Sequence, residues 1–233
     1  MQPALHKRLL AEFVSTYCLV LIGCGSMAVE SKTGLLTHVG VAIVWGLIVM
    51  VMIYTVGRIS GAHMNPAVSI AFAAVGRMPA FDAAAYVITQ CAGALTGAAA
   101  IAGVMGVDDV KLGSTMTELA PLAAVAVEFM MTAMLMFVVM GVSTGAKEES
   151  ITAGLAVGAT IAMEAFVAGP LTKASMNPAR SIGPALVSGY TENLWIYIVA
   201  PIAGALCGGF LYLLMQNEEE TQEAATSLGI ERE

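Results

Sequence analysis

The tripeptide Asn-Pro-Ala occurs twice in this chain, and the residues around its two copies also match. The copies begin at Asn65 and Asn177, which are 112 residues apart, the difference between 177 and 65. The other matching pairs at this separation include Gly57 and Gly169, Ala62 and Ala174, Met64 and Met176, and Ser69 and Ser181. Two further landmarks recur in the same order: AGALTG at 92–97 returns as AGALCG at 203–208, and Glu-Phe at 12–13 returns at 128–129. These repeats predict two homologous halves, each carrying one Asn-Pro-Ala.

The composition is that of an integral membrane protein. The chain is 58% hydrophobic and 12% charged, with a mean hydropathy of +0.82, whereas about a quarter of the residues of a soluble domain are charged. A very apolar soluble domain would still need polar faces on its helices, and long segments here have none. Six segments have the roughly 20 largely apolar residues that a membrane-spanning helix needs. They are residues 9–29, 36–56, 83–104, 119–142, 151–167 and 194–215.

Two more apolar segments, 65–76 and 177–188, are too short to cross a membrane. At about 1.5 Å per residue, a helix of this length reaches roughly 17 Å, about half the thickness of the hydrocarbon core. Each half is therefore expected to hold three spanning helices and one half-spanning helix. Since three is an odd number, the second half must enter the membrane from the opposite side, which predicts an all-α fold of two inverted-topology repeats.

The same reasoning divides the chain into a short N-terminus, a membrane-spanning domain and a tail. The N-terminus comprises residues 1–8 and the domain residues 9–215, with one repeat at about 9–105 and the other at about 119–215. Residues 216–233 carry much of the net charge of −7, and this acidic tail is expected to be solvated and disordered.

Basic residues give the predicted orientation. Five lie at positions that share the side of the N-terminus, against three in loops on the other side. The first group is Lys7, Arg8, Arg58, Arg77 and Lys147, and the second is Lys32, Lys111 and Lys173. The positive-inside rule then places both termini in the cytoplasm of a multi-pass protein of the cell membrane.

Asparagine followed by proline is a typical helix start, because Asn is a good N-cap and Pro is best tolerated at the first helical position. In an inverted repeat the two short helices would begin at the midplane of the bilayer, preceded by the segments 60–64 and 172–176. Two helix N-termini facing one point would repel a proton or cation and would offer donors to a neutral hydroxyl compound. An anion site is the competing interpretation. It ranks lower because no other matched cation is expected at that depth.

Residues 8–215 resemble the aquaporins, the family of major intrinsic proteins. The resemblance is carried by the two Asn-Pro-Ala copies at this spacing, by Ser-Gly-Ala-His at 60–63 before the first, and by Arg180 after the second. It implies a homotetramer in the lipid bilayer with one pore per subunit, and Asn65 and Asn177 at the pore midplane. Glu12 and Glu128 match buried glutamates that brace the re-entrant loops in the family, although an intramembrane carboxylate is also a functional candidate in its own right.

The resemblance also implies which residues line the pore. The backbone of Gly61, Ala62 and His63 would line it in the first half, and that of Thr172, Lys173, Ala174 and Ser175 in the second. His63 could alternatively relay protons, but the pore-lining role is preferred.

By spacing, the family's four-residue constriction falls at Trp45, Ala165, Ala174 and Arg180. Water-selective relatives have an aromatic residue and a histidine at the first two positions, so alanine in place of the histidine predicts a wider opening that is apolar on one side. The set resembles glycerol facilitators and, more closely, nodulin-type members. Ser181 and Ala174 depart from the usual glycerol facilitator, which leaves metalloid acids such as arsenite or boric acid as further candidate solutes.

The sequence has no His/Cys metal cluster, phosphate-binding loop or nucleophile setting, so we expect no enzyme activity, cofactor, metal or nucleic-acid partner. The predicted function is a passive channel for water and small neutral solutes. Alternatives are a water-selective aquaporin and an ion-coupled secondary transporter, in which Glu164 would be the coupling carboxylate. A packing role for Glu164 is preferred, and Lys173 is expected to add positive potential at the outer mouth.

Overall fold

The computed structural model describes residues 3–107, 111–143 and 147–216, and all the regular secondary structure of these residues is helical. In chain order the elements are α1 (Leu5–Thr33), α2 (Thr37–Ser60), α3 (Pro66–Ala74), α4 (Ala80–Met105), the 3-10 turn η1 (Lys111–Gly113), α5 (Pro121–Ser143), α6 (Lys147–Thr172), α7 (Pro178–Ser188) and α8 (Ile196–Leu213). Six of these helices are long and apolar enough to cross a membrane, and α3 and α7 are the two short ones. The predicted fold class is confirmed. The acidic tail lies outside the described residues beyond Gln216.

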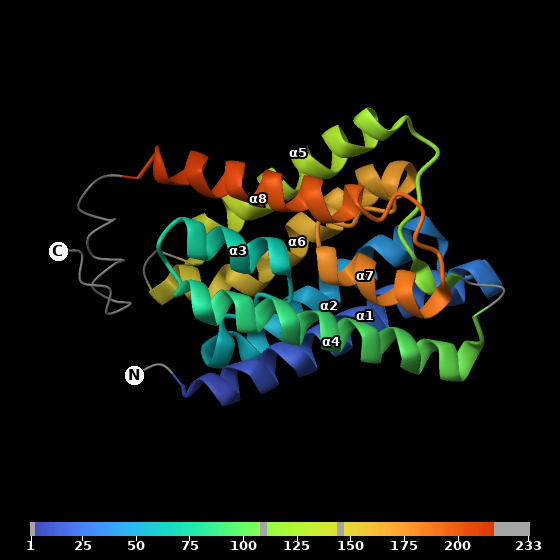
Figure 1. Ribbon diagram of the computed structural model, residues 1–233, viewed down its shortest axis with the longest axis horizontal. Helices are drawn as coiled ribbons and strands as arrows, with labels where there is room; N and C mark the ends of the chain where they lie inside the picture. The colour runs from blue at the N-terminus through green and yellow to red at the C-terminus, as the bar shows by residue number, and fades with distance from the viewer. Residues whose placement is uncertain (1–2, 108–110, 144–146, 217–233) are drawn as a thin grey trace.

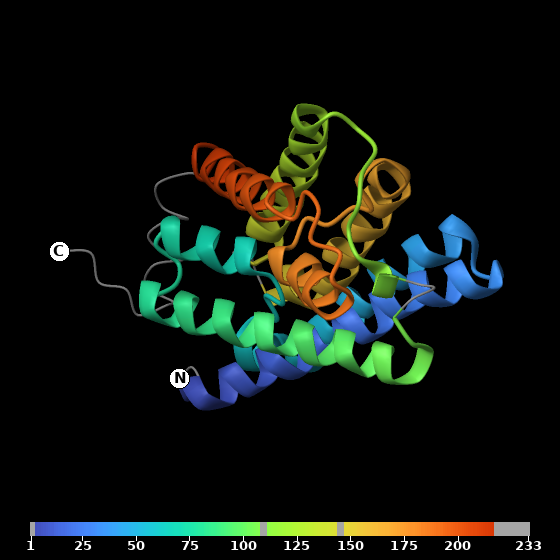
Figure 2. The same ribbon diagram turned by 45° about the vertical axis from the view of Figure 1, so that its right-hand side comes forward.

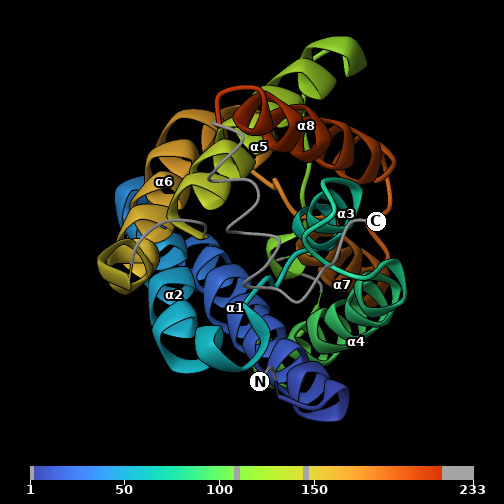
Figure 3. The same cartoon turned by 90° about the vertical axis from the view of Figure 1, so that its left-hand side faces the viewer.

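The two short helices begin near the middle of the bundle and run toward opposite ends. Figure 1 shows α3 returning to the end at which α2 arrives, while α7 continues toward the end at which α6 arrives. The start of α1 and the end of α8 lie at the same end of the bundle. Helix α4 runs alongside both short helices (Figure 2), and α3 is held between α4 and α8 (Figure 3).

Glycines on α4 and α8 allow two pairs of long helices to pack closely in the same way. A Cβ added to Gly93 would lie 2.5 Å from the Phe13 carbonyl oxygen, and one added to Gly97 would lie 2.8 Å from that of Tyr17. Gly204 faces the carbonyl of Phe129 at equally short range in the second half. Backbone therefore packs on backbone between α1 and α4 and between α5 and α8, as small residues permit in membrane helices.

Helix α6 is longer than the sequence predicted. The apolar segment of the sequence ends at residue 167, just before a Gly-Pro pair of the kind that usually ends a helix, yet α6 continues through Pro170 to Thr172. Proline has no N–H to donate to the carbonyl of residue 166, four positions before it. The Nε2 of His38 on α2 donates to that Phe166 oxygen instead, at 2.9 Å. A side chain from a neighbouring helix thus satisfies the acceptor that Pro170 leaves open.

Candidate pore

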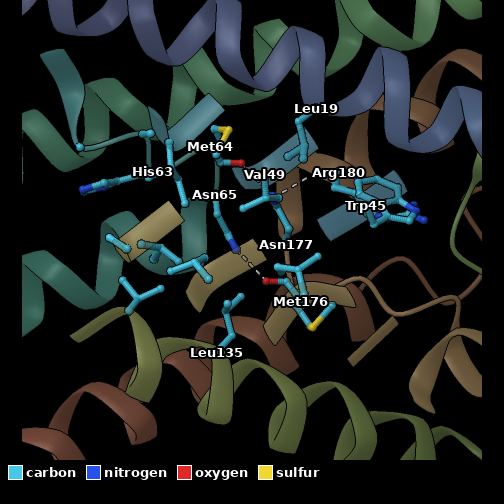
Figure 4. A pocket seen from close by; sticks show the side chains of 18 of the residues that line it. Leu19, Trp45, Val49, His63, Met64, Asn65, Leu135, Met176, Asn177 and Arg180 are labelled. Atoms are coloured by element: carbon cyan, nitrogen blue, oxygen red, sulfur yellow. Dashed lines mark hydrogen bonds between the residues drawn. The ribbon is translucent and has the colours of Figure 1, made fainter. Parts of the chain in front are cut away.

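The two asparagines cap the short helices and also join them. The side-chain oxygen of Asn65 accepts from Ala67 N at 2.9 Å, and that of Asn177 accepts from Ala179 N at 3.0 Å. Each amide nitrogen crosses to the other half: Asn65 Nδ2 donates to Met176 O at 2.8 Å and Asn177 Nδ2 donates to Met64 O at 2.7 Å (Figure 4). An amide nitrogen carries two N–H groups, so each asparagine keeps one donor for the adjoining cavity.

Buried glutamates hold the two loops in matching ways. Glu12 accepts from Ser60 Oγ at 2.6 Å, His63 N at 3.0 Å and Met64 N at 2.8 Å. Glu128 accepts from the matching donors in the second half, at the same three distances: Thr172 Oγ1, Ser175 N and Met176 N. Both carboxyl groups are fully buried. Each carboxyl group accepts from two backbone N–H groups and one hydroxyl, so these side chains fix the loop backbone.

The loops need such support because their backbone is unfavourable. Ala62 and Ala174 have φ of 50° and 47°, and Met64 and Met176 have φ of 51° and 52°. A left-handed conformation costs a non-glycine residue roughly 1–2 kcal/mol. In this conformation the backbone N–H groups and carbonyl oxygens point in opposite directions. The N–H groups of residues 63, 64, 175 and 176 point toward a glutamate.

The hydrogen bonds that support the two loops differ at two positions that the sequence analysis did not single out. Gln90 Nε2 also donates to Glu12 Oε2, at 2.8 Å, but the matching position on α8 is Pro201, 111 residues later. Tyr86 OH likewise donates to Ser60 O at 2.9 Å, whereas the matching Tyr197 OH has no hydrogen-bond partner among the described residues. The repeat offset itself could have revealed both pairs.

One cavity, here called the pore cavity, passes between the halves and is lined by both asparagines. Its polar lining also includes His63 and Arg180, and apolar side chains from α1, α2, α5 and α6 form the facing wall. Those side chains are Leu19, Val49, Leu135, Val139, Val157 and Ile161. Of the loop residues proposed to line the pore, Gly61, Ala62, Ala174 and Ser175 also lie in the wall of this cavity, whereas Thr172 does not. Lys173 lines a second cavity, described below.

His63 is fixed in place by its neighbours. Its Nδ1 is hydrogen-bonded to Ser69 Oγ at 3.0 Å, and its ring stacks on Phe72 with centroids 4.8 Å apart. An edge contact to Tyr86 at 5.3 Å completes the packing. The imidazole thus forms a fixed part of the wall at the α3 side of the asparagines.

Trp45, Ala165, Ala174 and Arg180 all line the pore cavity, and Figure 4 shows Trp45 and Arg180 next to each other. Beyond them is a second cavity, here called the vestibule, lined by Met27, Glu30, Ser31, His38, Val41, Ala42, Trp45, Ala165, Gly169, Lys173 and Ala174. Trp45, Ala165 and Ala174 line both cavities, so this is where the two meet.

Arg180 is almost fully buried, at 1% exposed. Its guanidinium lies over the indole of Trp45, 4.8 Å from the ring centroid. Nη1 donates to Gly113 O at 2.9 Å, and Nη2 donates to the Met27 sulfur at 3.1 Å. Among the described residues no carboxylate forms a salt bridge with it, since the ion pair found there joins Arg8 and Asp82. The meeting point of the cavities therefore carries a positive charge with no salt-bridge partner in the described part of the chain.

Glu164 precedes Ala165 on α6 but points elsewhere. Its side chain is 1% exposed and lines neither the pore cavity nor the vestibule. Both carboxyl oxygens lack a hydrogen-bond partner within the described part of the chain.

Comparison with known proteins agrees with this architecture. The family model described as "Major intrinsic protein" matches residues 1–212. The chain is 43% identical to a probable NIP-type aquaporin of Nicotiana alata, covering 95% of this chain and 84% of that protein. It is 42% identical to nodulin-26 of Glycine max, covering 97% and 85%. The X-ray structure of the aquaglyceroporin from Plasmodium falciparum matches with a TM-score of 0.79 at 21% identity, covering 96% of this chain and all of the other, and supports the fold. The chain therefore belongs to the family of major intrinsic proteins.

Proposed function

We propose that this chain is a passive channel for water and small neutral solutes that turns back protons and ions. The observation that carries this proposal is the pair of helix starts, Asn65 and Asn177, hydrogen-bonded to each other's loop beside the pore cavity. Each helix N-terminus presents about half a positive charge. As is general for aquaporin-type pores, such a pair together with an arginine raises the electrostatic barrier to cations and protons. The positive charge of Arg180 adds to that barrier.

The constriction favours a solute that is apolar on one side and hydroxylated on the other. Trp45 supplies a large apolar surface, Ala165 and Ala174 leave space, and Arg180 supplies N–H donors. Glycerol fits this description, because its carbons can lie on the indole while its hydroxyls accept from the guanidinium. Arsenite and boric acid, which are small neutral hydroxylated molecules, are the next candidates. Trp45, Ala165, Ala174 and Arg180 are thus proposed as the selectivity residues.

We also propose the orientation of the chain in the membrane and its oligomeric state. Both termini are placed in the cytoplasm of a cell membrane, so that the vestibule opens to the outside and Lys173 contributes positive potential there. A homotetramer is proposed from the family, with a complete pore in each subunit, since the cavities described here are formed by a single chain.

Stopped-flow light scattering on proteoliposomes tests the proposal. We expect glycerol and water flux to rise linearly with the gradient and to be the same with or without sodium or a pH difference. A flux that saturates and depends on either ion would identify an ion-coupled carrier. Water flux without any glycerol flux would identify a water-selective pore, and a proton current through the intact protein would contradict the barrier at the asparagines.

A further inference from the structure

Two residues on one face of α1 stand directly behind the constriction. Gly23 and Met27 are four positions apart, which places them one above the other on the helix. Gly23 contacts the indole of Trp45, and Met27 contacts the guanidinium of Arg180. These are the two large side chains of the constriction, and neither α1 residue was singled out from the sequence.

Gly23 provides the space in which the indole lies. A Cβ added to Gly23 would lie within 2.6 Å of three carbons of the Trp45 ring, closer than van der Waals contact allows. The ring is 8% exposed and has the Arg180 guanidinium 4.8 Å from its centroid. Since Trp45 borders both cavities, open space is found on the pore side. A side chain at position 23 would therefore push the indole into the opening.

Met27 holds the guanidinium on the α1 side. Within the described residues, the guanidinium has one side-chain acceptor, the Met27 sulfur, which lies 3.1 Å from Nη2. The other acceptors are backbone oxygens, of Gly113 at 2.9 Å and of Lys173 at a long 3.5 Å, and Nε has no hydrogen-bond partner in the described part of the chain. Because Arg180 also borders the pore cavity, a guanidinium released by Met27 has room to move into the opening.

We propose that this face of α1, formed by Gly23 and Met27, sets the width of the constriction and so the largest solute that passes. Both are positioning residues, since Gly23 acts through Trp45 and Met27 acts through Arg180. The inference rests on the proposed channel function. It assigns part of the solute selectivity to a helix that contributes neither an Asn-Pro-Ala nor a residue of the four-residue constriction.

Gly23→Ala tests the first half of this proposal in proteoliposomes. We expect the ratio of glycerol to water permeability to fall about tenfold, the change that about 1.4 kcal/mol of added barrier produces. Gly25→Ala is the matched control, because it makes the same substitution on the same helix and its Cβ would meet its nearest atom, on Ile101, at 4.0 Å. Adding Trp45→Phe to Gly23→Ala should restore glycerol passage relative to Gly23→Ala alone, because the smaller ring relieves the overlap.

Met27→Leu tests the second half, because leucine keeps the apolar volume and removes the acceptor. We expect the glycerol to water ratio to fall and Met27→Gln, which returns an oxygen acceptor, to recover it. Met131→Leu on α5 is the control for replacing a partly buried methionine. Retained water permeability per protein shows that each variant folds.

The outcomes separate the two proposals. A wild-type protein without linear glycerol and water flux would overturn the channel function itself. A conducting wild type in which Gly23→Ala and Gly25→Ala give the same ratio, with or without Trp45→Phe, would overturn the role of Gly23. Equal ratios in Met27→Leu and Met131→Leu would overturn the role of Met27.

Discussion

At the scale of single residues, the pore depends on buried acceptors that compensate for an unfavourable backbone. Ala62, Met64 and their counterparts in the second half keep left-handed conformations because Glu12 and Glu128 accept the N–H groups that these conformations expose. The sequence pointed to both glutamates through the repeat, since a carboxyl group in an apolar helix is costly unless it is bonded. It did not show that Glu12 has one more donor than Glu128.

Because Glu12 has one more donor than Glu128, replacing each by glutamine should lower the stability of the protein by different amounts. Glu12→Gln and Glu128→Gln should both destabilise the protein, because an amide has one acceptor oxygen where each carboxylate uses two. Glu12→Gln should cost more, by about 1–3 kcal/mol, because it also places an amide against the Gln90 amide and leaves a buried donor without an acceptor. Thermal unfolding in detergent measures this. Gln90→Leu should remove the difference between the two variants, and equal melting temperatures in the wild-type background would contradict the assignment.

A second residue-scale prediction concerns Ala174, which borders both cavities. Ala174→Cys should make water and glycerol flux sensitive to mercurials, with reversal by added thiol, since a bound mercury would lie where the two cavities meet. The wild-type protein should respond weakly, because no native cysteine is among the residues lining either cavity. Ala159→Cys, at an exposed position on α6 that lines neither cavity, is the control. Strong block of the wild type would show that the lining is assigned incorrectly.

The contacts that Gly23 and Met27 of α1 make with the constriction could not be predicted from the sequence, and the reason is physical. Trp45, Arg180 and the asparagines are conspicuous because bulky, charged or helix-capping residues carry their own signal. Glycine and methionine are ordinary components of apolar helices, so Gly23 and Met27 have no distinguishing pattern. Their role arises when packing places α1 behind the constriction, and that neighbourhood is a tertiary property.

At the scale of helices, the sequence located all eight membrane elements but not every end. Hydropathy and the Asn-Pro pairs are strong signals over whole segments, and they gave the six long helices and the two short ones. The end of α6 was misplaced because the apolar run stops at residue 167 and the Gly-Pro pair that follows is by itself a helix stop signal. The contact between His38 and Phe166 O overrides that signal, and it joins residues 128 positions apart in the sequence.

This contact predicts a compensating pair of substitutions. His38→Leu should destabilise the protein by about 1 kcal/mol, because the Phe166 carbonyl loses its donor at a partly solvated site. In a Pro170→Ala background the same change should be nearly neutral, since alanine supplies the N–H that proline lacks. A double-mutant cycle on thermal stability in detergent measures the coupling. Additive effects would mean that His38 and Pro170 act independently and that the carbonyl is satisfied in another way.

At the scale of the whole molecule, the question is whether the chain is a fixed pore or a carrier that alternates between two states. A carrier driven by an ion gradient needs a carboxylate that meets its ion in a cavity open to one side and then to the other. Glu164 is the candidate from the sequence, yet it lines neither cavity and lies buried beside α6's lining residue Ala165. A buried side chain that reaches neither cavity is not placed to meet an ion entering from either side, which favours the fixed pore.

Substitutions at Glu164 therefore distinguish the two modes of transport. Glu164→Gln should leave glycerol and water flux linear in the gradient and independent of sodium and pH. Glu164→Met should in addition raise the melting temperature in detergent, because an apolar side chain of similar volume removes a buried polar group that has no partner among the described residues. Stopped-flow measurements on both variants beside the wild type check the first expectation. A carrier would lose transport or its ion dependence on either change, whereas in a pore of fixed width the flux follows the constriction, which neither change touches.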